Sequence, residues 1–523
     1  MSKTIIIIGA GLAGLSAALQ AAENGCNVKL VSSLPSERAQ SVMAEGGINA
    51  ALNTKDENDS PEEHFTDTIK AACGLADPNA VWGMTQAAPE LVHWLLKLGV
   101  KFNMSGYDDV DLRNFGGQKK KRTAFAQSDT GKQIMTAMID AVRRKEASGM
   151  VERFSHHSFL TLRLCGNICC GCVIRDEYSQ ETVELPGDAV IVATGGMHGL
   201  FGNTTGSLSN TGEVTAELFR LGVPLANGEM IQYHPTTVKC GGKRMLISEA
   251  ARGEGGRLFA MKDGKQWYFM EEKYPELGNL MPRDITAREI WKVSHESEVF
   301  LDMTEISDEI ISNKLSGLAD DCMTYLHKDI RKEPVSVLPG IHYFMGGILV
   351  DEQHRTSIQN LYAAGECCAQ YHGANRLGGN SLLGALYGGR VAAKSACEQA
   401  DVVDLSCATQ IDFPPASQIS EIKQLNKVMQ ETMGVVRNEN TLLNGIQTVQ
   451  ALTGNLPLLG MAVLKSALAR KESRGAHWRE DYPKSNDDDY LKTTVARFDG
   501  KQIQISFVPC LLYTSPSPRD GLL

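Results

Sequence analysis

One arginine of this chain lies in a stretch of glycines and asparagines, where a fixed charge and close ligand approach can combine. The stretch reads His372-Gly373-Ala374-Asn375-Arg376-Leu377-Gly378-Gly379-Asn380-Ser381-Leu382. Glycine lets the backbone come close to a ligand, and the guanidinium supplies a permanent positive charge. Other motifs with histidine or arginine lie upstream, at His234, Arg283 and His342. We predict that these residues complete one charged pocket.

The N-terminus carries a dinucleotide-binding fingerprint in its expected context. Thr4–Ile8 is a short, continuous apolar run, which is typical of a strand buried on both faces. The turn Gly9-Ala10-Gly11-Leu12-Ala13-Gly14 follows at once, Leu15–Ala22 has a helical composition, and Asn27–Val31 supplies a second strand. The glycines permit a tight turn close to a pyrophosphate, and the helix N-terminus offers free N–H groups. The sequence therefore predicts a βαβ unit that binds a dinucleotide.

One part of that fingerprint is absent. The second strand ends Leu30-Val31-Ser32-Ser33, without the acidic residue that usually binds the ribose about 20 residues after the glycines. Ser32 can form a hydrogen bond with a ribose hydroxyl instead. Dinucleotide binding is still predicted, but the match to an NAD site is weaker.

Two later strands indicate that the nucleotide-binding domain is discontinuous. Ala189–Ala193 is a buried strand that leads into Thr194-Gly195-Gly196, and Asn360–Ala364 is another that leads into Gly365-Glu366. Strands that return after so long a segment imply an inserted domain. We place the nucleotide-binding domain at residues 1–228 and 345–410, and the inserted domain at residues 229–344.

A helical domain is predicted after a linker marked by Pro414-Pro415. Apolar residues recur there at three- and four-residue steps, as in an amphipathic helix. These residues are Ile422, Leu425, Val428, Met429 and Met433. The same pattern recurs around Leu464–Leu468, so we place this domain at residues 416–480.

The last part of the sequence departs from this organisation. Residues 509–523 show no periodicity, and the run Tyr513-Thr514-Ser515-Pro516-Ser517-Pro518 is similar to the translated read-through of a sequencing adaptor. We expect residues 509–523 to be an adaptor-derived artefact and residues 481–508 to be a truncated C-terminal segment.

Composition describes an ordinary globular protein and restricts its partners. The 523 residues are too many for one core, so two to four domains are expected. A net charge of -10 argues against nucleic acid as a partner, and no apolar run is long enough to span a membrane. Because Met1-Ser2-Lys3 leads directly into a strand, no secretory signal is expected, and the predicted location is the cytoplasm.

The 13 cysteines are interpreted as reduced thiols, as expected for a long chain without a secretory signal. The densest group is Cys165, Cys169, Cys170 and Cys172. A metal site there is one alternative, but no second cluster has iron–sulfur or zinc spacing. We therefore favour thiols on a β-meander and predict no metal.

Several longer motifs are spread along almost the whole chain. They are Ala44-Glu45-Gly46-Gly47, Gly116-Gly117 through Arg122-Thr123, Gln232-Tyr233-His234-Pro235-Thr236, Ser248-Glu249-Ala250-Ala251-Arg252-Gly253-Glu254-Gly255-Gly256, Pro282-Arg283-Asp284, His342-Tyr343-Phe344-Met345-Gly346-Gly347 and Glu472-Ser473-Arg474-Gly475-Ala476-His477. From Lys3 to about Ser506, the chain resembles the flavoprotein subunit of fumarate reductase and succinate dehydrogenase, in the FAD-dependent oxidoreductase 2 superfamily that also contains L-aspartate oxidase. The resemblance implies an α/β fold, in which a Rossmann-like FAD-binding domain holds an inserted α+β capping domain and precedes a C-terminal helical domain.

The resemblance also implies a site for a C4 dicarboxylate. Such a substrate needs cationic or hydrogen-bonding groups at both ends, and the arginine fork suits a carboxylate best. By the matching family positions, His342 and Arg376 would hold one carboxylate, and His234 and Ser248 would hold the other. The family often has threonine at the last position, and serine keeps the hydroxyl.

Reducing fumarate requires a hydride on one alkene carbon and a proton on the other. Arg283 matches the family's proton donor, and Glu249 and Arg252 match the relay that returns a proton to it. Arginine hardly deprotonates in proteins, so the role of Arg283 depends on that relay. A salt-bridge cluster without a catalytic role remains the alternative interpretation.

FAD is the cofactor that the resemblance implies. Members of the membrane complexes carry a flavin-linked histidine where this chain has Gln40, and an amide cannot form that bond. We therefore expect non-covalent FAD and, because the covalent link tends to raise the flavin potential, a preference for fumarate reduction over succinate oxidation. The positions that match FAD contacts are Gly9, Gly11, Gly14, Ser32, Gly46, Gly47, Thr194, Gly195, Glu366, Ser381 and Leu382.

Three other functions share part of these motifs. L-Aspartate oxidase is the main alternative, although Phe115–Phe125 and Asp487–Thr493 are more similar to the fumarate reductase form. A second alternative is a reductase of another acrylate, which fits less well because a substrate with one carboxylate would use only one of the two predicted carboxylate sites. A third is a non-enzymatic flavin-binding subunit, which would not need Arg283.

The electron donor must lie outside this chain, because the sequence contains no haem or iron–sulfur motif. Two sources remain open: an iron–sulfur subunit with a membrane anchor, and a diffusible reduced carrier. The first source would hold the chain at the inner face of the membrane through its partner subunits.

Overall fold

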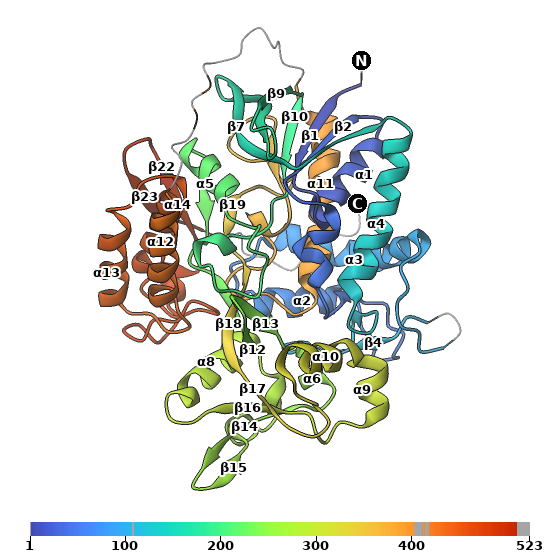
Figure 1. Ribbon diagram of the computed structural model, residues 1–523, viewed down its shortest axis with the longest axis vertical. Helices are drawn as coiled ribbons and strands as arrows, with labels where there is room; N and C mark the ends of the chain where they lie inside the picture. Colours follow the sequence, from blue (N-terminus) through green and yellow to red (C-terminus); the bar gives the residue numbers. More distant parts are fainter. Residues whose placement is uncertain (1, 107–108, 402–410, 412, 414–417, 510–523) are drawn as a thin grey trace, which may run out of the picture.

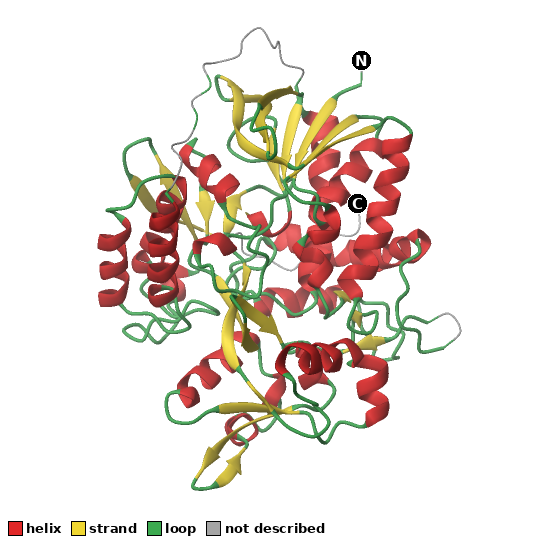
Figure 2. Cartoon of the chain, in the orientation of Figure 1, coloured by secondary structure: helices red, strands yellow, loops and turns green. Residues whose placement is uncertain are grey.

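The computed structural model describes residues 2–106, 109–401, 411, 413 and 418–509. Three regions surround its centre (Figure 1), and Figure 2 shows that each region mixes helices with strands. The predicted linker at Pro414-Pro415 and residues 510–523 lie outside the described residues. Pro509, the first residue of the segment predicted to be adaptor-derived, ends a strand.

A parallel five-stranded sheet forms the nucleotide-binding region, in the order β20-β10-β1-β2-β6. The buried run of β1 explains its central place, because Ile5 and Ile7 pack against helices on one face while Ile6 and Ile8 pack against a β-meander on the other. The sequence predicted four of these strands, all except β6, and the return of two of them after long segments. The strands are β1 (Thr4–Ile8), β2 (Asn27–Ser32), β6 (Val151–Ser155), β10 (Ala189–Val192) and β20 (Leu361–Ala363).

Helices cover one face of this sheet and an antiparallel meander covers the other (Figure 1). The helices are α1 (Leu12–Glu23), α3 (Pro78–Leu98), α4 (Thr130–Ala147) and α11 (Asn380–Gln399), and α2 (Pro61–Ala71) packs against α3. The meander consists of β7 (His157–Cys165), β8 (Ile168–Asp176) and β9 (Thr182–Pro186). It carries the four clustered cysteines, as predicted. The described residues contain no group of three or more histidine, cysteine or acidic side chains that could hold a metal ion.

The helix of the fingerprint begins earlier than its composition indicates. It was predicted over Leu15–Ala22, but α1 begins at Leu12, because Gly11 in an extended conformation serves as its N-cap. The preceding turn requires glycine at position 9: its φ is 109°, and a Cβ there would lie 2.3 Å from the carbonyl oxygen of Ala193. The βαβ unit and its glycine turn are therefore present where the sequence predicted them.

The inserted region lies below the nucleotide-binding region in Figure 1 and has its own apolar core. A long antiparallel pair connects the two regions, β12 (Ile231–Cys240) with β18 (Leu338–Phe344), and β13 (Lys243–Leu246) extends it. A second sheet contains β14 (Arg257–Lys262), β15 (Lys265–Trp267), β16 (Val299–Asp302) and β17 (Val335–Ser336). The helices are α6 (Glu249–Gly253), α7 (Phe269–Lys273), α8 (Arg283–Ser294), α9 (Asp308–Lys314) and α10 (Ser316–Asp321).

In its described part, the C-terminal region contains the helices α12 (Ile419–Thr432), α13 (Glu439–Val449) and α14 (Asn455–Ala469). The predicted amphipathic pattern is confirmed, since Leu425, Val428 and Met429 of α12 are buried in a shared core with α14. Beyond them, α15 (Asp487–Tyr490) precedes the hairpin of β22 (Lys492–Phe498) and β23 (Ile503–Pro509). This hairpin completes a mixed sheet with β11 (Leu225–Ala226), β19 (Gly347–Leu349) and β21 (Cys368–Ala369).

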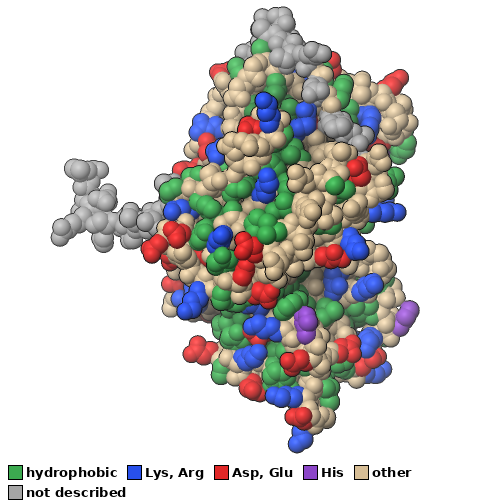
Figure 3. All heavy atoms as spheres, turned by 90° about the vertical axis from the view of Figure 1, so that its left-hand side faces the viewer, with side chains coloured by type: hydrophobic (Ala, Val, Ile, Leu, Met, Phe, Trp, Pro, Cys, Tyr) green, Lys and Arg blue, Asp and Glu red, His purple; other side chains and the backbone are tan. Residues whose placement is uncertain are grey.

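Apart from short 3-10 and π-helical turns, the remaining strands and one helix lie between these regions. They are β3 (Ile48–Asn49), β4 (Leu112–Arg113), β5 (Thr123–Ala124) and α5 (Glu213–Arg220). Acidic and basic side chains are interspersed on the face seen in Figure 3. Within the described residues, no helix has the length and apolar character needed to cross a bilayer.

Candidate active site

One cavity of about 530 Å³ brings together almost all of the predicted site residues. It extends from the turn between β1 and α1 to the start of α11 and reaches β12, β18 and α6 of the inserted region. The predicted residues that line it are Gly9, Gly11, Ser32, Gly46, Gly47, Thr194, Gly195, His234, Ser248, Glu249, Arg283, His342, Glu366, Arg376, Ser381 and Leu382.

Two predicted residues lie behind the cavity wall. Gly14 lies within α1, where a Cβ would come within 1.8 Å of the carbonyl oxygen of Gly9, so this glycine allows the helix to pack on its own turn. Arg252 is buried next to Glu249, and its Nη1 donates a hydrogen bond to the carbonyl oxygen of Asn279. A direct FAD contact by Gly14 stays a prediction.

The end of the cavity near the glycine turn fits a dinucleotide such as FAD. Gly9 and Gly11 leave the backbone open at the N-terminus of α1, which has no side-chain cap. The Oγ of Ser32 is buried without a hydrogen-bond partner among the described residues, so it is available to a ribose hydroxyl. At the opposite end, α11 also lacks a side-chain cap, and Ser381 and Leu382 line the cavity there. Free helix N-termini suit the phosphates and carbonyl groups of such a cofactor.

Arg376 supplies a buried positive charge that has no acidic partner within the described residues. Its guanidinium lies 4.4 Å from the centre of the Tyr343 ring, and its Nε is buried without a hydrogen bond. Burial, together with the positive charge of Arg283, lowers the pKa of Arg376 to about 9. A buried cation without a partner is costly, so this position favours an anionic ligand.

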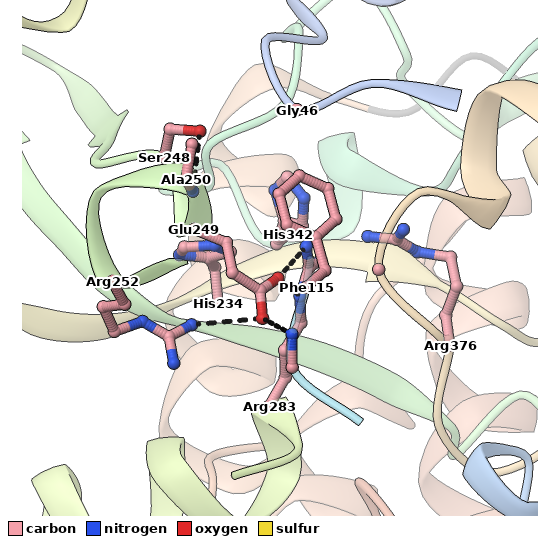
Figure 4. A network of polar contacts seen from close by, with 12 residues as sticks. Gly46, Phe115, His234, Ser248, Glu249, Ala250, Arg252, Arg283, His342 and Arg376 are labelled. Atoms are coloured by element: carbon pink, nitrogen blue, oxygen red, sulfur yellow. Dashed lines mark hydrogen bonds and ion pairs between the residues drawn. The ribbon is translucent and has the colours of Figure 1, made fainter. Parts of the chain in front are cut away.

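Two histidines lie beside each other in the same cavity (Figure 4). The rings of His234 and His342 have centroids 5.2 Å apart. Nδ1 of His342 is 2.8 Å from the Thr205 hydroxyl, and Nδ1 of His234 faces the main chain of Thr236, which leaves Nε2 of each ring for a ligand. Burial and the nearby arginine charges hold the pKa of both histidines well below the usual range. Both rings are therefore neutral at neutral pH, and Nε2 of each ring can donate to a ligand in the tautomer that carries its proton there.

Glu249 connects two arginines in a buried cluster (Figure 4). Its Oε2 accepts a hydrogen bond of 2.7 Å from Nε of Arg283, and its Oε1 lies 3.4 Å from Nη2 of Arg252. Burial alone would raise the pKa of Glu249, but the charges of Arg283 and Arg252 lower it overall. The three predicted catalytic residues thus form one continuous polar chain, with Arg283 and Glu249 at the cavity.

Sequence reasoning missed three residues that support this site. Gln232 accepts a hydrogen bond of 3.1 Å from Nη1 of Arg283 and donates one to the carbonyl oxygen of Arg376, so it joins both arginines. Thr205 contacts His342, and Glu45 lines the cavity close to Ser248. Gln232 and Glu45 lie inside motifs that the sequence analysis had recognised, but nothing in the sequence marks Thr205.

The buried carboxyl of Glu45 should make the folded protein less stable as pH rises. Burial and the charge of Asp321 raise the pKa of its carboxyl from 4.5 to about 8. The folded chain then keeps a proton that the unfolded chain releases, so the free energy of unfolding falls as pH rises from 4.5 to 8, by about 1.4 kcal/mol per pH unit at most. Glu45→Gln stays neutral and should gain stability relative to wild type across this range, as measured by thermal unfolding at pH 5, 6, 7 and 8.

A matched control is Glu37→Gln, which alters an exposed glutamate nearby. The melting temperature of this variant should change with pH in the same way as that of wild type. If the difference between Glu45→Gln and wild type were constant from pH 5 to 8, the protonated state assigned to Glu45 would be wrong.

Comparison with known families agrees with this geometry. A family described as FAD binding domain matches residues 4–382, well over half of the chain. A second family, described as fumarate reductase flavoprotein C-term, matches residues 453–520. The FAD-binding fold and the C-terminal region are therefore both assigned independently of the cavity.

Several known proteins are similar over almost their full length. The succinate dehydrogenase flavoprotein subunit of Bacillus subtilis is 38% identical, with 99% of this chain and 98% of that protein covered. The 8-methylmenaquinol:fumarate reductase flavoprotein subunit of Wolinella succinogenes is 32% identical, with 95% and 89% covered. Among solved structures, the E. coli quinol fumarate reductase FrdA matches with a TM-score of 0.89 at 27% identity, with 99% of this chain and 98% of that chain covered. The chain belongs to the family of succinate dehydrogenase and fumarate reductase flavoprotein subunits and is an FAD-dependent oxidoreductase.

Proposed function

We propose that this protein interconverts fumarate and succinate and favours fumarate reduction. The observation that carries the proposal is the unpaired, buried guanidinium of Arg376, which shares a cavity with two neutral histidines and the Arg283–Glu249 pair. These groups suit a small dianion better than a neutral or singly charged molecule. Relatives named for both directions of the reaction are similar to this chain, so the direction rests on residues of the chain itself.

The substrate would be held at its two ends. Arg376 and Nε2 of His342 would bind one carboxylate, while Nε2 of His234 and the Ser248 hydroxyl would bind the other. Ser248 accepts a hydrogen bond from the backbone N–H of Ala250, so its own hydroxyl proton can be donated to the substrate or to the neighbouring Glu45 carboxyl. Thr205 would position His342, because its hydroxyl occupies Nδ1 and keeps the ring from turning. Charge-assisted bonds at both ends would fix the alkene and polarise it.

Arg283 would deliver the proton. FAD, when bound, supplies the hydride for the other alkene carbon. Gln232 and Glu249 bind opposite sides of the Arg283 guanidinium, so the cation cannot rotate away from the cavity. After donation from an Arg283 nitrogen, the adjacent Glu249 and Arg252 would return a proton along the buried chain. Such a relay explains how a group with so high an affinity for its proton can act repeatedly.

We expect the FAD of this protein to be bound without a covalent link. Gln40, in the short 3-10 helix Gln40–Met43, lines the cavity at the position where the resembling membrane complexes carry their flavin-linked histidine. Because an amide cannot form that bond, acid precipitation should leave yellow flavin in the supernatant. A flavoprotein with covalently linked flavin, denatured in parallel, should keep its colour in the pellet. Flavin that remains on this polypeptide would contradict the proposal.

L-Aspartate oxidase remains the alternative, since it would share both carboxylate sites. The two activities separate in one pair of assays on the purified holoprotein. Reduced viologen dye with fumarate under argon measures reduction, and aspartate with oxygen measures oxidation. We expect dye oxidation that depends on fumarate and little peroxide formation that depends on aspartate. Aspartate turnover faster than fumarate turnover would favour the alternative.

The chain also needs an electron donor, and we propose a partner subunit as the source. The names of the similar proteins describe them as flavoprotein subunits. An iron–sulfur partner with a membrane anchor would place this chain at the inner face of the membrane, whereas a diffusible reduced carrier would not. The test is to purify the native protein from the membrane fraction of cells that express it. A partner subunit that co-purifies with it would support the first source, and its absence would favour a diffusible carrier.

A further inference from the structure

Two cysteines far apart in the sequence meet outside the active site. The Sγ atoms of Cys26 and Cys397 lie 2.9 Å apart, although 371 positions separate the residues. Cys26 is buried in the turn between α1 and β2, and Cys397 is half-buried in the last turn of α11. We propose that this pair is a redox-modification site, where hydrogen peroxide converts the two thiols into a reversible disulfide that joins α1 to α11.

The packing of the two helices holds the thiols close together. α1 and α11 lie side by side (Figure 1), and Ser16 in α1 donates a hydrogen bond of 2.7 Å to the carbonyl oxygen of Leu386 in α11. A Cβ on Gly389 would lie 2.3 Å from the carbonyl oxygen of Ala13, so the backbones touch without a side chain between them. Since a disulfide places its sulfurs about 2.05 Å apart, the Sγ atoms need to move by less than about 1 Å.

The oxidation balances with peroxide as the only oxidant. The Cys397 thiolate, the more accessible of the two, attacks one oxygen of hydrogen peroxide; the O–O bond breaks, a sulfenic acid forms and hydroxide leaves. The Cys26 thiolate then attacks the Cys397 sulfur, the S–O bond breaks and a second hydroxide leaves. Two thiols and one peroxide thus give one disulfide and two waters. Peroxide is available at this protein, because dioxygen forms it when it takes two electrons from a reduced flavin.

The rate at which peroxide forms the disulfide should rise with pH. Burial and the hydrogen bond with Cys26 raise the pKa of the Cys397 thiol, so little thiolate is present near neutrality. The positive charge of Lys3, which donates a hydrogen bond to the carbonyl oxygen of Cys397, lowers the pKa of the Cys397 thiol only in part. Glu398, the adjacent acid, acts in the opposite direction. The site should therefore respond to sustained peroxide rather than to a brief pulse.

The disulfide would act on the FAD-binding unit. The N-terminus of α1 carries the glycine turn and that of α11 carries Ser381 and Leu382, and both line the cavity. A bond between the opposite ends of these helices would fix them relative to each other. It would also close a very long loop in the unfolded chain, the case in which a cross-link restricts that state most. The oxidised protein should melt at a higher temperature and release FAD more slowly.

A peptide map of the wild-type holoprotein tests the proposal without any variant. The protein is treated with hydrogen peroxide at pH 7 and pH 8.5, quenched with catalase, alkylated and digested with trypsin without reductant. We expect residues 4–29 linked to residues 395–423, with fragmentation that places the bond at Cys397 and more product at pH 8.5. Dithiothreitol should remove the link and lower the melting temperature to its initial value.

Variants separate this pair from other thiols. Cys397→Ser and Cys26→Ala should lose both the link and the peroxide-induced shift in melting temperature. Cys73→Ser, which removes another half-buried thiol, should keep both. The proposal is overturned if the linked peptide is missing while Cys397 is recovered alkylated or as sulfinic acid, or if the bond maps to Cys407 of the same peptide.

Discussion

Replacing Arg283 by lysine should reduce fumarate turnover by about 10³-fold while fumarate binding stays within a few-fold of wild type. Lysine keeps the positive charge but loses the fork that contacts Gln232 and Glu249 at once. The proton would then no longer be held at a fixed position relative to the alkene. An interaction made only in the transition state appears in kcat rather than in substrate affinity. Steady-state kinetics with a reduced dye, together with fumarate titration of the oxidised protein, measure both quantities.

The matched control is Arg288→Lys, on the same helix. Arg288 lies 4.0 Å from the Trp478 ring and does not line the cavity, so turnover should be nearly unchanged. Glu249→Gln should reduce turnover as Arg283→Lys does, because it interrupts the relay. Near-normal turnover in Arg283→Lys would leave Arg283 a structural ion, as the salt-bridge interpretation holds.

Replacing Arg376 by alanine should weaken fumarate binding by about 2 to 5 kcal/mol, which corresponds to roughly 30-fold to several thousandfold in Kd. Arg376 is a buried cation that has no acidic partner among the described residues, so its loss would leave a substrate carboxylate unpaired. His342→Ala should weaken binding less, because a neutral donor is lost rather than a charge. The change in flavin absorbance on fumarate addition measures the affinity.

Arg390→Ala serves as the control for this variant. Arg390 lies on α11 over the ring of Trp94, outside the cavity. Its removal should leave fumarate affinity unchanged. Equal losses in Arg376→Ala and Arg390→Ala would mean that the effect comes from disturbing α11 rather than from the substrate site.

Local patterns explain which parts of the fold were predictable. The apolar run Thr4–Ile8 and the glycine turn after it have strong local signals, because a buried parallel strand needs continuous apolar residues and the turn needs glycine at position 9. The spacing of apolar residues predicted α12 in the same way. Helix ends were less predictable: α1 begins three residues before the prediction, since its N-cap is a glycine without a capping side chain.

Contacts between distant segments were not available from such patterns. Thr205 reaches His342 across 137 positions, and a threonine in a loop has no mark that distinguishes this role. Gln232 lies in a recognised motif, but its hydrogen bonds with Arg283 and Arg376 require β12 to lie beside both α8 and the loop before α11, which no local pattern indicates. The Cys26–Cys397 contact likewise follows from helix packing alone. The resemblance to a family identified the charged residues, and the structure adds the residues that position them.

The most direct test of the proposed function is a single turnover of the flavin. The protein is photoreduced under argon and mixed with fumarate in a stopped-flow instrument, with acrylate and aspartate in parallel experiments. We expect fumarate to restore the absorbance of oxidised flavin with one succinate formed per flavin, whereas acrylate, which lacks the second carboxylate, and aspartate leave the flavin reduced. A reduced flavin that stays reduced in saturating fumarate, or that is reoxidised as fast by acrylate, would contradict the assignment of this cavity to a C4 dicarboxylate.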